Sequence, residues 1–121
     1  MAVDLQRGEI LWREPVGEDN RLGVRGVFNL GPTLATAGGL VFHGGTQDPA
    51  LRVHDVETGE IIARLELPAS THAGPITYRT RPDGPQYLVV AAGGHHNVGR
   101  LNLSSRLGDW IIAYALPASA R

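Results

Sequence analysis

The stretch that decides the fold is "AVDLQRGEILW" at residues 2–12, because "VHDVETGEIIA" at residues 53–63 repeats it with a constant offset of 51 residues. The matched pairs are Ala2 and Val53, Asp4 and Asp55, Gly8 and Gly59, Glu9 and Glu60, and Trp12 and Ala63. In each copy the aspartate can accept backbone hydrogen bonds within a turn, and the glycine can adopt the positive φ that closes it. Repeats of about 40 to 50 residues built from short strands are typical of a β-propeller.

Short apolar and β-branched runs recur along the chain between 16 glycines and 8 prolines, and no segment sustains a helical period. These runs predict nine strands, at about residues 2–5, 9–13, 33–36, 40–44, 50–55, 60–67, 75–80, 86–92 and 109–115. Runs such as "YLVVAA" and "WIIAYA" are apolar on both faces, so other sheets must cover them when no helix is available. We therefore expect an all-β chain of four-stranded antiparallel propeller blades, with a β-sandwich as the alternative.

The expected strands group into three parts of one propeller segment that spans residues 1–121, about two blades in all. Residues 1–13 would end one blade, 33–67 would form a full blade and 75–115 a partial last blade. In an up-and-down blade the long connections emerge at the same end, where functional loops usually lie. That end would gather the polar residues Asn29, Thr46, Gln47, Asp48, Thr71, His72, His95, His96 and Asn97.

The composition excludes several kinds of chemistry for this chain. All eleven basic residues are arginine and there is no cysteine, so a lysine amine, a thiolate and a disulfide are excluded. A net charge of −1 gives no excess of positive charge that could bind nucleic acid, and we expect no nucleic-acid partner. No apolar run approaches the ~18 residues of a spanning helix, and the N-terminus lacks a signal-peptide pattern, so any membrane or export element is expected outside these residues.

Two adjacent histidines, His95 and His96, follow the pair Gly93–Gly94 and are the candidate functional side chains. The glycines let the backbone turn sharply and approach a ligand. A neutral imidazole there can bond a hydroxyl or move a proton, and the alternative is a loop histidine that only satisfies backbone groups. With His72 the pair forms a conceivable three-histidine metal site, but no spacing enforces one and we assign no metal ligand.

Each of the remaining polar candidates can have either a functional or a purely structural role. Asp48 can bind a hydroxyl, or it can cap the turn before Pro49. Arg100 and Arg106 can pair with anionic groups or remain solvated. We expect structural roles for a further set of residues: Asp4, Trp12 between neighbouring blades, His43, His54, Asp55 and Asp109.

Two blocks of the sequence carry a resemblance to a known family. "AVDLQRGEILW" resembles the Ala-x-Asp-x-x-Thr-Gly-x-x-x-Trp docking repeat of quinoprotein dehydrogenases. The block running from "NLGPTLATAGGLVFHGGTQDPALRVHDVETGE" through "LPASTHAGPITY" and "QYLVVAAGGHHNVG" to "LGDWIIAYALP" resembles the C-terminal part of membrane-type glucose and polyol dehydrogenases that depend on pyrroloquinoline quinone (PQQ). The resemblance spans nearly the whole chain.

The resemblance implies a fold, a cofactor and a reaction. The family fold is an eight-bladed propeller with PQQ and a Ca²⁺ or Mg²⁺ ion in a funnel near its axis. A sugar or other alcohol would be oxidised there, and ubiquinone or another acceptor would take the electrons, on the periplasmic side of the inner membrane. The partners implied are the substrate, the acceptor and the remaining propeller blades or further copies of this chain.

The resemblance also implies pocket residues. His95 stands at the position of the family's Gly-Gly-His motif, which influences substrate and cofactor handling. Asp48, in "TQDPALRV", stands where the family has an aspartate implicated near the site. Asn29, in "FNLGPT", is a weaker match, because the second glycine of the family's loop is missing. His96 is a further pocket candidate, at a position where many relatives have a compact glycine-rich loop. Departures from the family pattern occur at Arg7, which replaces the motif threonine, and in the long "NVGRLNLSSR" insertion.

The function implied is that of a segment of a PQQ-dependent dehydrogenase, and the alternative is a non-catalytic propeller scaffold or binding module. The family's catalytic base and its quinone-contacting lysine belong to earlier blades, so we expect this segment to be inactive alone and assign it no catalytic residue. The blocks "AAGGHH" and "LGDW" favour the enzyme. As a separate product, the chain would expose unpaired blade edges that favour self-association into a ring.

Overall fold

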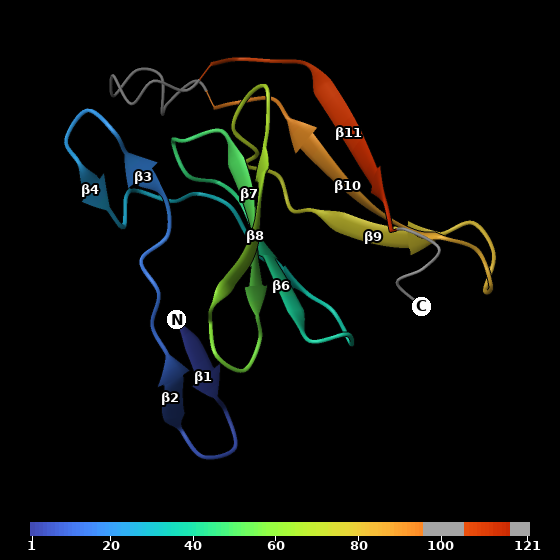
Figure 1. Ribbon diagram of the computed structural model, residues 1–121, viewed down its shortest axis with the longest axis horizontal. Coiled ribbons are helices and arrows are strands. Elements are labelled where there is room, and N and C mark those ends of the chain that lie inside the picture. Colours follow the sequence, from blue (N-terminus) through green and yellow to red (C-terminus); the bar gives the residue numbers. More distant parts are fainter. Residues whose placement is uncertain (96–105, 117–121) are drawn as a thin grey trace.

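The computed structural model describes residues 1–95 and 106–116, which form strands, turns and loops (Figure 1). The strands are β1 (Ala2–Asp4), β2 (Glu9–Trp12), β3 (Glu18–Asp19), β4 (Val24–Arg25), β5 (Thr33–Ala35), β6 (Leu40–His43), β7 (Ala50–Asp55), β8 (Ile61–Glu66), β9 (Ile76–Arg79), β10 (Gln86–Ala92) and β11 (Trp110–Ala115). Within these two ranges there is no helix long and apolar enough to cross a membrane.

The strands pair antiparallel with their sequence neighbours into four sheets: β1–β2, β3–β4, the four-stranded β5–β6–β7–β8 and the three-stranded β9–β10–β11. The all-β, propeller-type architecture predicted from the repeat is thereby confirmed, and each of the nine predicted strands overlaps a strand of the structure. The hairpin β3–β4 lies between the predicted strands at 9–13 and 33–36, where the sequence predicted no strand. Its two-residue strands are too short to produce an alternating pattern.

The core lies between the four-stranded and the three-stranded sheets. It consists of Phe42, Leu51, Val53, Leu67, Ala69, Leu88, Val90 and Ala92, with six partly buried apolar residues around it. Strand β7 is buried on both faces, because Leu51 and Val53 point into this core while Arg52 and His54 point to the opposite face. A sheet covered on both faces by other sheets is what stacked blades require.

The repeated Asp-x-x-x-Gly motif forms the same turn in both copies. Asp55 Oδ1 accepts hydrogen bonds from the backbone N–H of Glu57 at 2.9 Å and of Thr58 at 2.8 Å, and Gly59 has φ of 78°. The first copy reproduces this around Asp4, whose Oδ1 accepts from the next turn residues at 2.9 and 3.1 Å. The predicted structural role of both aspartates is confirmed.

Trp12, on β2, joins the β1–β2 sheet to the four-stranded sheet β5–β6–β7–β8. Its ring stacks on His54, with centroids 6.1 Å apart and planes 12° apart, and its Nε1 donates to the backbone oxygen of Val56 at 2.9 Å. A Cβ on Gly59 would lie 2.5 Å from the Trp12 ring, so the glycine provides the flat surface on which the ring rests. The predicted packing of Trp12 between neighbouring sheets is confirmed.

The outer face of the three-stranded sheet is apolar and uncovered. Ile76 is 57% and Ile111 is 73% exposed, and Tyr78 stacks on Tyr87 with centroids 5.2 Å apart on the same face. β11 pairs only with β10 in the part of the chain that the structure describes. This face and edge have the character of a surface against which another sheet packs.

Candidate functional site

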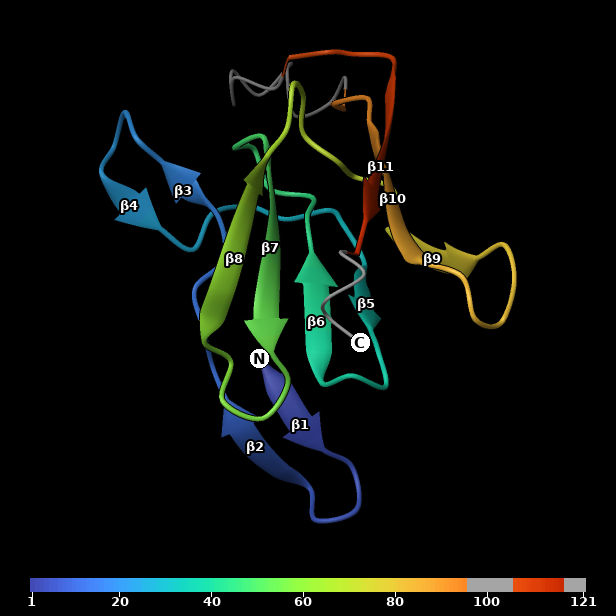
Figure 2. The same cartoon turned by 45° about the vertical axis from the view of Figure 1, so that its right-hand side comes forward.

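Four connections meet at one end of the sheets, at the top of Figure 2. They are the hairpin β3–β4 and the connections β6–β7, β8–β9 and β10–β11. An isolated bridge joins Asn29 to Thr46, and Gly94 N–H donates to the backbone oxygen of Ser70 at 2.8 Å. Residues that are far apart in the sequence are therefore held in one hydrogen-bonded layer, as the loop lengths predicted.

Glycines allow this layer to be dense. Gly45 has φ of 88°, and a Cβ there would lie 2.1 Å from the Gly31 nitrogen. Gly94 has φ of 69°, and a Cβ there would lie 2.3 Å from the Arg106 backbone oxygen. Both positions require a residue without a side chain and with access to the left-handed region. The sharp turn expected before His95 is thus present at Gly94.

Asp48 lies at the centre of a buried ionic network. Its Oδ2 pairs with the Arg52 guanidinium and with Arg64 at 3.3 Å, while Oδ1 accepts from the Glu18 backbone N–H at 3.1 Å. Arg52, 2% exposed, also donates to Thr46 Oγ1 at 3.2 Å. Burial alone would raise the pKa of Asp48, but the hydrogen bonds and charge around it lower the pKa overall. Both carboxylate oxygens are therefore engaged by the protein.

Asn29 is engaged in the same way. Its Oδ1 accepts from the Gly31 N–H at 3.0 Å, and its Nδ2 donates to the Gly44 oxygen at 3.0 Å and contacts His43 Nε2 at 2.8 Å. Because Nδ2 can only donate, His43 Nε2 must accept, which assigns the proton of the neutral ring to Nδ1. Asn29 thereby ties its loop to β6.

His43 is uncharged near neutral pH. Burial, followed by the nearby charges of His54 and Arg52, lowers the pKa of His43 to about 4 from 6.5. His54 is 2% exposed, its ring lies 6.4 Å from the His43 ring, and its Nδ1 contacts the Gly59 backbone oxygen at 3.0 Å. Both strand histidines therefore have the satisfied, structural environment that the sequence indicated.

This environment predicts acid sensitivity. Since the His43 pKa is lower in the folded state, the unfolded chain binds its proton first, and stability should fall as the pH drops from about 6.5 to about 4. Allowing for partial exposure, we expect this residue to contribute a loss of about 1–2 kcal/mol. Urea unfolding at pH 7 and pH 5, compared between the wild type and His43→Gln, isolates this contribution. An equal loss in both proteins would contradict the assignment.

His72 and His95 lie side by side on two neighbouring connections. Their ring centroids are 5.4 Å apart and their planes are tilted by 58°. Both ring nitrogens of His72 are buried and have no hydrogen-bond partner among the described residues. Burial, and secondly the charge of His95, lowers the pKa of His72, so this imidazole is neutral near neutral pH.

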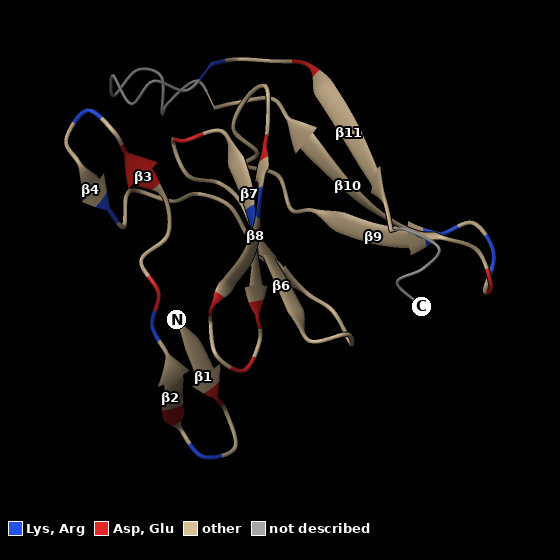
Figure 3. Cartoon of the chain, viewed as in Figure 1, with Lys and Arg blue, Asp and Glu red and all other residues tan. Residues whose placement is uncertain are grey.

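Three of the residues singled out in the sequence lie outside the described residues, namely His96, Asn97 and Arg100. Within the described ranges no group of three or more His, Cys, Asp or Glu side chains is placed to hold a metal ion. Asp109 and Arg106 lie in the segment that leads into β11, where Gly108 N–H donates to the Gly93 oxygen at 3.0 Å. Figure 3 shows charged residues in several turns and on the short strand β3, and basic positions on the central strands β7 and β8, which carry Arg52 and Arg64.

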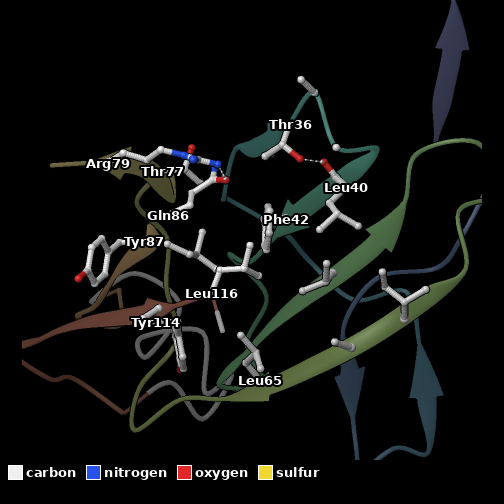
Figure 4. A pocket seen from close by; sticks show the side chains of 17 residues that line it. Thr36, Leu40, Phe42, Leu65, Thr77, Arg79, Gln86, Tyr87, Tyr114 and Leu116 are labelled. Carbon is white, nitrogen blue, oxygen red and sulfur yellow. Dashed lines mark hydrogen bonds between the residues drawn. The ribbon is translucent and has the colours of Figure 1, made fainter. Parts of the chain in front are cut away.

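An apolar cleft of about 730 Å³ lies at the opposite end of the two large sheets (Figure 4). Phe42, Leu65 and Tyr114 line it, and Arg79 and Gln86 provide polar groups at its edge. None of the candidate residues Asn29, Asp48 and His95 contributes to it. Strands of both large sheets contribute lining residues to the cleft.

Sequence reasoning missed the partners of Asp48. Arg52 and Arg64 occupy strand positions where a basic residue would ordinarily face solvent. Arg52 does carry a usable signal, since it is a charge within the otherwise apolar run "ALRV" of a doubly covered strand. Such a charge requires a buried partner of opposite sign. Asp48 and Asp55 are both within four positions of Arg52, and the structure shows that Asp48 is the partner.

Comparison with protein families supports the fold. The model for the PQQ-type β-propeller domain of glucose, ethanol and alcohol dehydrogenases matches residues 1–88. Among solved structures, a europium-containing methanol dehydrogenase superposes with a TM-score of 0.69 at 22% identity, over 94% of this chain and 22% of that one. At 22% identity this similarity supports a shared fold but not a shared activity.

Curated relatives match over nearly the whole chain. A probable quinate dehydrogenase (quinone) of Xanthomonas campestris pv. juglandis is 40% identical over 96% of this chain, and the quinoprotein glucose dehydrogenase A of Acinetobacter calcoaceticus is 37% identical over the same share. The chain spans about 15% of the length of each of these relatives.

Proposed function

The chain belongs to the PQQ-type β-propeller family of glucose, ethanol and alcohol dehydrogenases, and from this premise we propose that it forms part of the active-site wall of a PQQ-dependent dehydrogenase. The reaction proposed is oxidation of an alcohol group of a sugar or polyol, with electrons passed to a quinone acceptor. The observation that carries the proposal is the position of His95, which a glycine turn directs beside His72 at the loop end of two packed sheets.

The sheets are proposed to be parts of successive blades: residues 1–13 the end of one, 33–67 a full blade and 75–115 a partial one. The uncovered apolar face of β9–β10–β11 supports a further blade as its partner, either from the rest of the polypeptide or from another copy of this chain. The relatives' names support the substrate class and the acceptor, since one is a glucose dehydrogenase and the other uses a quinone. A periplasmic location at the inner membrane is proposed with them.

The described residues fit a polar ligand at the edge of a cofactor pocket and do not by themselves form a metal site. The unpartnered nitrogens of His72 beside His95 suit polar groups of a bound molecule that can donate and accept hydrogen bonds. Ligands for a Ca²⁺ or Mg²⁺ ion would come from other blades, because no cluster of three candidate ligands exists in the described ranges. When bound, PQQ accepts two electrons from the alcohol carbon.

The pocket residues are proposed to have different tasks. His95 would bind the substrate or the cofactor edge, and His96 is kept as its proposed neighbour. Asp48 and Asn29 are proposed to act from behind the pocket, because their polar atoms already hold the loops together. Such residues keep the pocket loops in place without touching the substrate.

The test is PQQ-dependent reduction of an artificial electron-acceptor dye by the complete protein, with Ca²⁺ or Mg²⁺ and with D-glucose, quinate or glycerol as substrate. We expect turnover only with added PQQ, and His95→Ala should lower kcat/KM by about 10- to 100-fold while circular dichroism stays unchanged. Arg81→Ala, on the exposed β9–β10 turn, is the matched control and should leave turnover intact. A folded protein without PQQ-dependent turnover would favour the scaffold instead.

A further inference from the structure

His72 occupies a rigid position on the connection between β8 and β9. The residues immediately before it are buried: Ser70 and Thr71 are each 1% exposed. Ser70 Oγ donates to the Gln47 oxygen at 3.0 Å, and a Cβ on Gly44 would lie 2.4 Å from Thr71 Cγ2. The backbone that leads into His72 therefore has no room to shift.

The neighbouring connection is fixed to the same backbone. Gly94 N–H donates to the Ser70 oxygen at 2.8 Å, one residue before His95. The backbones of the two connections are thus linked directly beside the two histidines, whose ring centroids lie 5.4 Å apart. A pair fixed in this way is preorganised for a ligand.

His72 has an unmet hydrogen-bonding capacity. A neutral imidazole has one donor and one acceptor, and both ring nitrogens are buried without a partner in the described part of the chain. Leaving a buried polar group unpaired costs about 1–3 kcal/mol. Among the described residues no hydrogen-bond partner offsets this cost, whereas hydrogen bonds to a bound polar molecule would.

We propose that His72 is a second substrate-binding residue, which acts with His95 to bind two hydroxyl groups of a polyhydroxy substrate. The inference rests on the proposed dehydrogenase function and adds to it one substrate-binding residue and a preference among substrates. It predicts that substrates with neighbouring hydroxyls are favoured over alcohols with only one.

The chemistry of the pair favours hydroxyls over the other ligands of histidine. A hydroxyl both donates and accepts, so it matches the mixed capacity of a neutral imidazole, whereas a carboxylate only accepts. A transition-metal ion requires further ligands, and no third histidine, cysteine or acidic side chain lies with these two in the described ranges.

The experiment compares the wild-type dehydrogenase with His72→Phe and His72→Gln. The first variant keeps a ring without polar atoms, and the second restores a donor and an acceptor. Each is assayed with whichever of D-glucose, quinate and glycerol the wild type oxidises fastest, and with 1-propanol, which has a single hydroxyl. We expect His72→Phe to raise KM for the polyhydroxy substrate by about tenfold, the equivalent of one hydrogen bond, to leave 1-propanol kinetics within about twofold, and to be partly rescued by His72→Gln.

A second readout separates this inference from the proposed function. In protein labelled with ¹⁵N-histidine, adding the same polyhydroxy compound, or D-glucose if none is turned over, should move the imidazole signals of His72 and His95 but not that of His54. Equal losses for both substrates in His72→Phe, or an unmoved His72 signal, would overturn the inference even in an active enzyme. Absence of turnover together with a moved His72 signal would overturn the dehydrogenase alone.

Discussion

Replacing Asp48 with asparagine should lower the free energy of unfolding by about 3–5 kcal/mol, because it leaves the Arg52 guanidinium buried without a counter-charge. Asparagine has almost the same shape, so packing changes little and the loss reports the missing charge. The same substitution weakens the hydrogen bond from the Glu18 backbone N–H to Asp48. This bond holds the β3–β4 hairpin against the loop layer, which consists of that hairpin and the connections β6–β7, β8–β9 and β10–β11. Urea unfolding followed by tryptophan fluorescence measures the effect.

The control for Asp48→Asn is Asp83→Asn. Asp83 is paired with Arg81 at 3.7 Å, but its side chain is 83% exposed, so this change should stay within about 0.5 kcal/mol. Since the pKa of Asp48 lies below its ordinary 3.8 in the folded state, its stabilising charge is present above that pH and lost below it, and the difference between wild type and variant should shrink in acid. A loss under 1 kcal/mol, accompanied by a raised KM for substrate, would instead assign Asp48 to the pocket.

Gly45→Ala should be at least as severe and should prevent the loop layer from closing. The new Cβ would lie 2.1 Å from the Gly31 nitrogen and 2.2 Å from its Cα, and both are backbone atoms that no side-chain rotation can remove. Leu30 N–H donates to the Gly45 oxygen at 2.9 Å, so relief of the collision would also break this bond. We expect a loss above about 4 kcal/mol, seen as a protein that is unfolded or insoluble at 25 °C.

Gly8→Ala separates the collision from backbone strain. Gly8 also has a positive φ, of 69°, but a Cβ there would meet nothing within 4 Å. This variant should therefore lose only the cost of the left-handed conformation, about 1–2 kcal/mol. Similar losses at Gly8 and Gly45 would mean that the two loops are not packed backbone to backbone.

Asp48 and Gly45 both stabilise the loop layer. The loop layer has little side-chain bulk at its centre and depends on glycine contacts and on one buried charge pair. A rigid layer of this kind can hold His72 and His95 at a fixed separation, which a flexible loop could not do. The proposed binding function therefore depends on residues that do not themselves contact a substrate.

Local patterns in the sequence were sufficient for most of the fold. The repeated Asp-x-x-x-Gly turn, the short apolar and β-branched strands and the docking tryptophan each depend on residues close together in the chain or on the 51-residue repeat. The alternation of long and short connections also placed the polar loops at one end. The β3–β4 hairpin escaped prediction, because two-residue strands have no period to detect.

The residue pattern alone predicts an all-β chain with blade-like repeats and a glycine turn before His95. Which side chains retain unpaired polar atoms for a ligand depends on the packing of the sheets and loops. Asp48 and Asn29 are bonded to residues up to 30 positions away, whereas His72, 23 positions from His95, retains two unpaired buried nitrogens beside it. The physical reason is that hydrogen-bond satisfaction in a buried site depends on partners brought together by sheet packing, and no local pattern records those partners.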